Sequence, residues 1–181
     1  MIWPISFVGA RCAGKSTAGR SLARALDLAF LDLDHLMLGL QADDQSGASA
    51  SSAGELLVQL GEPAFRRLEA RALRQAMDRP DPRWVLATGG GAVLDAGSRR
   101  ILAEASTCIW LRCAPETLAK RMLADRQLRP SLTGAAPSEE IRQVLAQREA
   151  LYGEVAAHVL DVDELSEQGV VCALIEVLDL L

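Results

Sequence analysis

The sequence contains few of the residues from which disulfide frameworks, zinc sites and histidine-based catalytic centres are built. Its 181 residues include four cysteines, and no two of these stand in a CxxC pair or at another zinc-binding spacing. We therefore expect reduced thiols rather than disulfides or a metal-binding cluster. The two histidines, His35 and His158, are expected to be structural. No apolar run approaches the roughly 20 residues that a membrane-spanning helix needs, so the sequence predicts no transmembrane segment.

An excess of positive charge is also absent. Lysine and arginine number 19 against 24 aspartates and glutamates, which gives a net charge of −5. The overall field of such a chain repels nucleic acid and anionic membrane surfaces, so any bound anion must be held by a local site. The first residues, MIWPISFVGA, have no basic segment before the apolar ones, unlike a secretory signal. The cytoplasm is the expected compartment.

Short apolar runs alternate with longer segments of helical periodicity. The runs predict strands over residues 5–8, 29–33, 84–88, 108–111 and 159–162. The periodic segments predict helices over residues 15–26, 63–77, 115–126, 139–156 and 167–178. This alternation is typical of βαβ units around a parallel sheet. We predict an α/β fold, a three-layer α/β/α sandwich with a central five-stranded parallel sheet, and one domain over the whole chain.

Two segments interrupt the alternation. Residues 41–54, QADDQSGASASSAG, are small and polar and cannot form a core, which predicts a flexible surface loop. Residues 127–137 form a second expected loop, which carries Arg129. Long loops in compact domains often act as lids over a site, although a plain surface loop is about as common. Ser138 is the expected N-cap of the helix that follows.

A glycine-framed motif lies between the first predicted strand and the first predicted helix. Residues 9–17, GARCAGKST, fit the pattern GxxxxGKS/T, with Gly9, Gly14, Lys15 and Ser16 at the fixed positions. In such a loop the backbone amides and the helix N-terminus point at a phosphate, and lysine adds a positive charge. The serine hydroxyl can bind magnesium. The flanking strand and helix favour a phosphate-binding loop over a chance match in a glycine turn.

Two aspartates stand at or just beyond the end of the second predicted strand. Strand three ends in ATGGG without an acidic residue, so Asp32 is the natural partner for magnesium. The chain has no NKxD signature for guanine, and ATP is therefore the expected nucleotide. Because ligands of open α/β sheets bind beyond the carboxyl ends of strands, Asp34 belongs at the same cleft. There it can orient a substrate hydroxyl and accept its proton, or it can simply cap the following helix.

Arginines and glycines occur where a plain scaffold does not need them. Arg148 interrupts the apolar stripe of its helix, which requires either a bound anion or a buried carboxylate as partner. Arg66 stands at helical spacing from Glu62 and Glu69, so a surface salt bridge is as good an interpretation as a binding role. Three glycines, Gly89, Gly90 and Gly91, follow the third strand and suit either close approach to a ligand or a flexible turn.

Six segments in this order make the sequence resemble shikimate kinase, a family of small-molecule kinases with a phosphate-binding loop. They are GxxxxGKST, DLD, GEPAFRRLE, TGGGAV, RPSL and QREALY, and together they span nearly the whole chain. The resemblance implies the P-loop kinase fold and transfer of the γ-phosphoryl group of ATP to the 3-hydroxyl of shikimate. It also implies magnesium as cofactor, small-molecule substrates only, a place in aromatic amino-acid biosynthesis, and a monomer.

The resemblance also assigns roles to the nucleotide-binding residues. Lys15 contacts the phosphates and takes part in catalysis, and Ser16 and Asp32 hold magnesium. Arg129 lies on a lid that closes over ATP and excludes water. The full expected nucleotide site consists of Cys12, Ala13, Gly14, Lys15, Ser16, Thr17 and Arg129. Arg121, in the helix before the lid, is a candidate for contact with adenine.

On the acceptor side the resemblance implies that Asp34 binds the substrate hydroxyls and acts as the base. Arg66 and Arg148 then bind the substrate carboxylate. The three glycines Gly89, Gly90 and Gly91 line the ring. Residues 41–54 lie where the substrate-binding segment of the family begins.

The sequence departs from the family at Cys12, where glycine is usual, so the phosphate loop must take its shape with a side chain present.

Two alternative functions remain open. A kinase for a related acid, such as quinate or aminoshikimate, fits the same arginines. A non-catalytic nucleotide-binding module is the other, although such a module is expected to have lost Lys15, Asp34 or Arg129, and all three are present.

Overall fold

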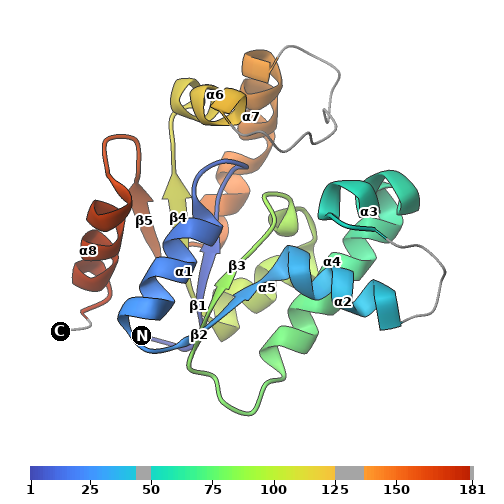
Figure 1. The fold of residues 1–181 in the computed structure, drawn as a ribbon, viewed down its shortest axis with the longest axis horizontal. Helices are drawn as coiled ribbons and strands as arrows, with labels where there is room; N and C mark the ends of the chain where they lie inside the picture. Colours follow the sequence, from blue (N-terminus) through green and yellow to red (C-terminus); the bar gives the residue numbers. More distant parts are fainter. Residues whose placement is uncertain (44–49, 125–136, 180–181) are drawn as a thin grey trace.

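The computed structural model describes residues 1–43, 50–124 and 137–179. Five parallel strands form one sheet in the order β2-β3-β1-β4-β5 (Figure 1). Their bounds are β1 Ile5–Val8, β2 Ala29–Asp32, β3 Trp84–Ala87, β4 Thr107–Arg112 and β5 His158–Asp161. The predicted five-stranded parallel sheet is therefore confirmed, and each predicted strand overlaps an observed one.

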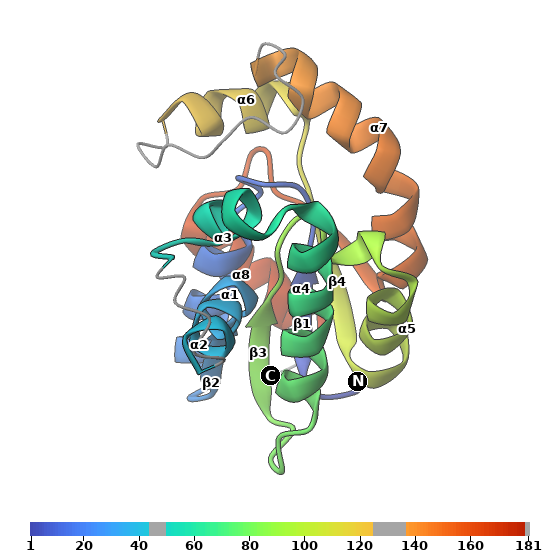
Figure 2. The same ribbon diagram turned by 90° about the vertical axis from the view of Figure 1, so that its right-hand side faces the viewer.

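Helices cover both faces of the sheet and complete the three layers (Figures 1 and 2). Alternate residues of a strand point to opposite faces, so Ile5 and Phe7 of β1 join one apolar cluster and Val8 joins the other. The first cluster includes residues of α1 (Lys15–Ala25) and α8 (Glu167–Val177). The second includes residues of α4 (Glu62–Met77), α5 (Ala96–Ala105) and α7 (Pro137–Val155).

Three α-helices lie outside the ranges that periodicity predicted: α2 (Leu33–Asp43), α3 (Ala53–Leu60) and α5. The α2 helix follows β2 with no loop between them, so no turn residues mark its start. The other two begin with local caps: the Ser52 hydroxyl accepts from the Glu55 amide at 3.2 Å, and an Asp95 carboxylate oxygen accepts from the Ser98 amide at 2.7 Å. Such side-chain caps are a sequence signal that could have revealed both helices.

The expected loop over residues 41–54 is too long at both ends. Residues 41–43 continue α2, where Gln41 is buried, and residues 53–54 open α3. The centre of this segment, residues 44–49, lies outside the described residues. The expected lid over residues 127–137 also lies outside them, except Pro137, with which α7 begins. Ser138 is therefore in the first turn of α7 and not its N-cap.

The remaining short elements are the 3₁₀ turn η1 (Ala92–Leu94) and α6 (Pro115–Ala124). Pro63 and Pro115 both stand in the first turn of a helix, where proline is tolerated. In the described part of the chain, no helix is long and apolar enough to cross a membrane.

The carboxyl ends of β2, β3 and β1 lie side by side at one edge of the sheet. The residues that directly follow these strands are consequently brought together, although they are far apart in sequence: the phosphate-loop motif after β1, the aspartates at the end of β2 and the glycines after β3. This is the edge at which open α/β sheets bind their ligands.

Candidate functional site

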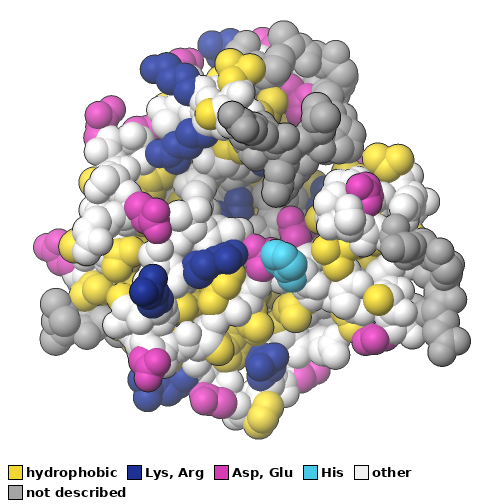
Figure 3. Space-filling view, viewed as in Figure 1, with side chains coloured by type: hydrophobic (Ala, Val, Ile, Leu, Met, Phe, Trp, Pro, Cys, Tyr) yellow, Lys and Arg dark blue, Asp and Glu magenta, His cyan; other side chains and the backbone are white. Residues whose placement is uncertain are grey.

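A cavity of about 530 Å³ lies at this edge of the sheet. Figure 3 shows basic and acidic side chains gathered around a hollow on the face of the molecule that carries α1. The predicted residues that line the cavity are Cys12, Gly14, Lys15, Ser16, Thr17, Asp32, Asp34, Arg66, Gly89, Gly90, Gly91 and Arg148. One cleft therefore holds both the expected nucleotide side and the expected acceptor side.

The phosphate-binding motif forms the loop between β1 and α1. Gly9 has a φ of 138°, and a β-carbon there would lie 2.6 Å from the Leu111 carbonyl oxygen, so only glycine fits. Gly14, with a φ of 92°, directly precedes α1. The Lys15 ammonium folds over the loop and donates to the carbonyl oxygens of Gly9 and Ala10 at 2.9 and 2.7 Å. A compact positive charge thus lies at the N-terminus of a helix, where anions bind.

Cys12 adopts a φ of 64°, in the left-handed region that glycine enters without strain. A non-glycine residue in this region costs about 1–2 kcal/mol. Its side chain is half-buried and packs against the apolar cluster under the loop. The loop therefore keeps a glycine-like backbone at this position with a thiol side chain present.

The two aspartates have separate positions at the start of α2. Asp32 accepts the Ser16 hydroxyl at 2.7 Å through one carboxylate oxygen and the Asp34 amide at 3.0 Å through the other. The second contact resembles a helix cap, so capping is provided by Asp32 rather than by Asp34. Asp34 lines the cavity, and one of its oxygens lies 3.4 Å from where a β-carbon on Gly89 would be.

Ser16 and Asp32 bring a hydroxyl and a carboxylate to one point beside the phosphate loop. Oxygen ligands of this kind are those that Mg²⁺ prefers, usually together with water and substrate phosphates. Two protein oxygens therefore suit a magnesium ion that is bound with a nucleotide, as was expected of this pair.

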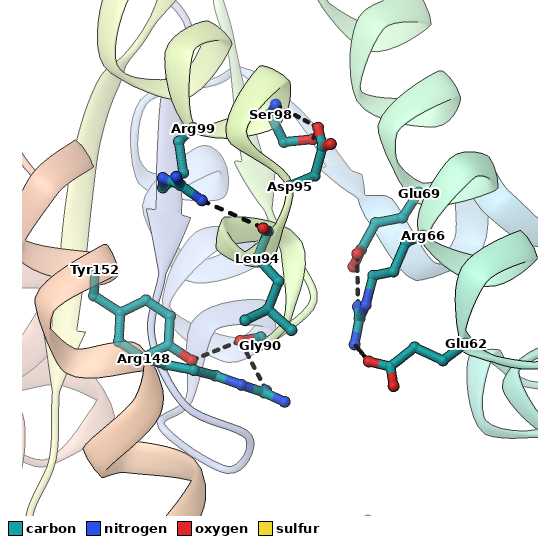
Figure 4. Close-up of polar contacts among 10 residues, drawn as sticks. All are labelled: Glu62, Arg66, Glu69, Gly90, Leu94, Asp95, Ser98, Arg99, Arg148 and Tyr152. Atoms are coloured by element: carbon teal, nitrogen blue, oxygen red, sulfur yellow. Dashed lines mark hydrogen bonds and ion pairs between the residues drawn. The ribbon is translucent and has the colours of Figure 1, made fainter.

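Arg66 forms a partly buried ion pair with Glu69 and a second one with the exposed Glu62. Its Nη1 lies 2.7 Å from Glu69 Oε2, and its Nη2 lies 3.5 Å from Glu62 Oε1 (Figure 4). Glu69 is only 2% exposed, and this burial raises its pKa, while the positive charge of Arg66 acts in the opposite direction. The negative charge of Asp34 raises the Glu69 pKa further. Glu69 therefore holds Arg66 at the wall of the cleft.

Arg148 is 9% exposed and reaches the cleft from α7. Its Nη1 donates to the Gly90 carbonyl oxygen at 3.2 Å, and its buried Nε has no hydrogen-bond partner in the described structure. The hydrogen bond of Arg148 thus goes to a backbone carbonyl, and its positive charge also opposes the rise in the pKa of the buried Glu69 carboxylate. Its charge remains directed toward the cavity.

The three glycines are places of close approach rather than a flexible turn. A β-carbon on Gly89 would lie 2.7 Å from Glu69 Oε1, and one on Gly91 would overlap the Arg66 guanidinium. A β-carbon on Gly90 would lie 3.2 Å from the Arg11 amide nitrogen. Side chains at these positions would displace the residues that form the acceptor side of the cleft.

A second cavity, of about 370 Å³, adjoins the phosphate loop on its other side. It is lined in part by Ala13, Leu111 and Val162, together with Arg121, whose Nη2 donates to the Val162 carbonyl at 2.9 Å. An apolar pocket with a guanidinium beside a phosphate loop suits a nucleobase. Arg129, the expected lid residue, lies outside the described residues.

Comparison with known proteins identifies the family. The family model described as shikimate kinase matches residues 11–179. This chain belongs to the shikimate kinase family. The resemblance found in the sequence is therefore confirmed, and the chain is an ATP-dependent kinase enzyme.

Individual proteins similar to this chain are shikimate kinases as well. A curated shikimate kinase 2 of Yersinia enterocolitica is 41% identical over 172 residues, which cover 94% of this chain and 92% of the relative. The crystal structure of shikimate kinase from Bacteroides thetaiotaomicron covers 99% of both chains with a TM-score of 0.85 and 28% identity. Shikimate kinase from Acinetobacter baumannii, solved in complex with shikimate, has a TM-score of 0.84 and 30% identity and covers 98% of this chain and 93% of that one.

Sequence reasoning missed two features of this shikimate kinase site. Glu69 was considered only as a surface partner of Arg66, because helical spacing does not show that a residue is buried. Arg11 also lines the cleft, with a buried Nε that has no hydrogen-bond partner in the described structure. Its position inside the glycine motif was the available signal.

Proposed function

We propose that this protein transfers the γ-phosphoryl group of ATP to the 3-hydroxyl of shikimate, giving shikimate 3-phosphate and ADP in aromatic amino-acid biosynthesis. The observation that carries the proposal is a single cleft with a phosphate-binding loop on one wall and Arg66, Arg148 and three close-packed glycines on another. The relative from Acinetobacter baumannii, whose structure contains shikimate, supports this choice of acceptor. Quinate and aminoshikimate carry the same carboxylate and are the alternative acceptors.

On the nucleotide side, residues 12–17 bind the phosphates through their amides and the helix N-terminus. The Lys15 ammonium, which reaches from the start of α1 over the loop, neutralises charge on the transferred group. Ser16 and Asp32 would hold Mg²⁺, which supplies further positive charge to the phosphates when it is bound. Arg121 and its neighbours take the adenine in the second cavity. Arg129 remains the proposed lid residue, on the family resemblance alone.

On the acceptor side, Arg66 and Arg148 bind the substrate carboxylate, and the glycines Gly89, Gly90 and Gly91 lie against the ring. Asp34 orients the 3-hydroxyl and takes its proton. The hydroxyl oxygen then bonds to the γ-phosphorus while the bond from that phosphorus to the β–γ bridging oxygen breaks, and ADP leaves with the electron pair. One domain, a monomeric state and a cytoplasmic location remain proposals of the same kind.

The test is ADP formation by the purified protein with Mg-ATP, in the presence and absence of shikimate. We expect strong stimulation by shikimate, and a loss of about 100-fold or more in kcat for Asp34→Asn, in the range of general acid–base catalysis. Asp78→Asn, at the exposed C-cap of α4, is the matched control and should keep wild-type kinetics. No stimulation by shikimate, with stimulation by quinate, would refute the named acceptor.

A further inference from the structure

Tyr152 is a buried residue of α7 to which neither the motif nor the reaction gives a role. Its side chain is fully buried, and its hydroxyl donates to the Gly90 carbonyl oxygen at 2.6 Å. The same oxygen accepts Arg148 Nη1 at 3.2 Å. Figure 4 shows the two side chains reaching Gly90 together from α7, with Arg66 on the opposite side of the gap. Two donors from one helix therefore hold one peptide group of the acceptor wall.

The tyrosine is fixed in place by its surroundings. Its ring packs on Trp110 of β4, with ring centroids 5.8 Å apart and planes tilted by 36°. Burial raises the pKa of Tyr152 to about 12, so the hydroxyl keeps its proton and remains a donor at neutral pH. A buried hydroxyl with a short bond to a carbonyl is a strongly constrained contact.

This contact fixes more than the carbonyl. The peptide between Gly90 and Gly91 is planar and trans, so its C=O and its N–H point in opposite directions. Because the Gly90 carbonyl faces α7, the Gly91 amide faces away from α7. Gly91 lines the cleft and lies against the Arg66 guanidinium. The tyrosine hydroxyl thus determines the direction of an amide donor in the wall of the cleft.

The backbone of Gly90 also lies close to the phosphate loop. A β-carbon on it would lie 3.2 Å from the Arg11 amide nitrogen and 3.4 Å from the Gly9 carbonyl oxygen, so its backbone lies against the phosphate loop. The Arg148 guanidinium donates to the Gly90 carbonyl at 3.2 Å and also lines the cleft. Removing the tyrosine hydroxyl would take away the shorter of the two bonds to this carbonyl and leave the longer one from Arg148.

We propose that Tyr152 is a positioning residue for the acceptor site. By donating to the Gly90 carbonyl, which Arg148 also contacts, it sets the direction of the Gly91 amide and fixes the peptide group beside the Arg148 guanidinium. It acts through these groups and does not touch the substrate. The inference rests on the proposed function, because it assumes that Arg148 and the glycines bind the acceptor.

The test compares Tyr152→Phe with a matched control, Ser106→Ala. Both remove one buried hydroxyl that donates to a carbonyl. Ser106 donates to the Leu102 oxygen at 2.7 Å and shares a second hydrogen bond of 2.6 Å with the Ser6 hydroxyl. It lies just before β4, at the other end of the sheet from the cleft. Three measurements are made on each variant and on the wild type. Initial rates are recorded with the concentrations of shikimate and of Mg-ATP varied in turn. Shikimate binding is measured by calorimetry, and stability by thermal melting.

For Tyr152→Phe we expect the KM and the Kd for shikimate to rise roughly 3- to 10-fold, the effect of one lost hydrogen bond, with the KM for Mg-ATP unchanged. Ser106→Ala should lower the melting temperature and leave both KM values at wild-type levels. A KM for shikimate within twofold of wild type in Tyr152→Phe overturns the proposal. So does an equal rise in both KM values, which indicates general loosening. A wild-type enzyme inactive toward shikimate instead refutes the proposed function, and the inference with it.

Discussion

The substitution Gly91→Ala tests the acceptor wall of the cleft without changing the nucleotide side. A β-carbon at Gly91 would overlap both terminal nitrogens and the central carbon of the Arg66 guanidinium. The guanidinium must shift to make room, and the shift acts on its 2.7 Å hydrogen bond to Glu69. The methyl group therefore displaces a binding residue and weakens its hydrogen bond to a carboxylate that is only 2% exposed. The change acts through one contact and adds no charge.

The size of the effect follows from that contact. Losing a hydrogen bond between charged groups costs about 1.5–3 kcal/mol, and each 1.4 kcal/mol is about a factor of ten. We therefore expect kcat/KM for shikimate to fall about 10- to 150-fold. The KM for Mg-ATP should stay near the wild-type value, because Lys15 and Ser16 are not disturbed.

The assay is ADP release at saturating Mg-ATP with shikimate varied, and the control is Gly39→Ala. Gly39 is an exposed residue of α2 with nothing within 4 Å of an added β-carbon. That substitution should keep wild-type kinetics and stabilise the helix by about 0.5–1 kcal/mol. A folded Gly91→Ala enzyme whose kcat/KM for shikimate lies within threefold of wild type would show that Arg66 does not bind the substrate as argued.

Two further predictions concern charge and thiols. Glu69→Gln removes the negative charge that holds Arg66, so the KM for shikimate should rise about tenfold. Because burial raises the pKa of Glu69, its carboxylate is neutralised at a higher pH than an ordinary glutamate. The wild-type KM should therefore rise as the pH falls while that of the variant changes less, and parallel pH profiles would contradict the assignment. Cys12 borders the phosphate site, so Mg-ATP should slow its reaction with a maleimide, followed by mass spectrometry of peptides. Cys113 is the control: burial raises the pKa of its thiol to about 12, so it should stay unlabelled in the folded protein with or without nucleotide. Equal labelling of Cys12 with and without nucleotide would show that Cys12 lies outside the phosphate site.

Much of the fold was predictable because its signals are local. An apolar run of four residues and an amphipathic period each reflect burial of one short segment, and the five strands were found from these alone. The α2 helix was missed because it continues from β2 without turn residues. The α3 and α5 helices were missed because Ser52 and Asp95 were not recognised as their N-cap residues. Residues 41–54 look uniformly polar, and composition does not show where helices end within such a segment.

The site was predictable where its residues belong to contiguous sequence motifs. The glycine-framed lysine defines the phosphate loop through local backbone geometry. The end of β2 places Asp32 and Asp34 at the sheet edge through the topology of parallel strands. Composition and spacing left Arg66 open between a surface salt bridge and a binding role, because neither reveals exposure.

The sequence by itself determined the order of the five strands, the phosphate loop, the family and the residue types of the cleft. Tertiary structure alone decided that Glu69 is buried against Arg66, that the three glycines lie against other groups, and that Tyr152 holds Gly90. The physical reason is that these contacts join residues far apart in the sequence. Tyr152 and Gly90 are 62 positions apart, and a contact across that separation depends on how α7 packs on the sheet, which no local pattern of residues contains.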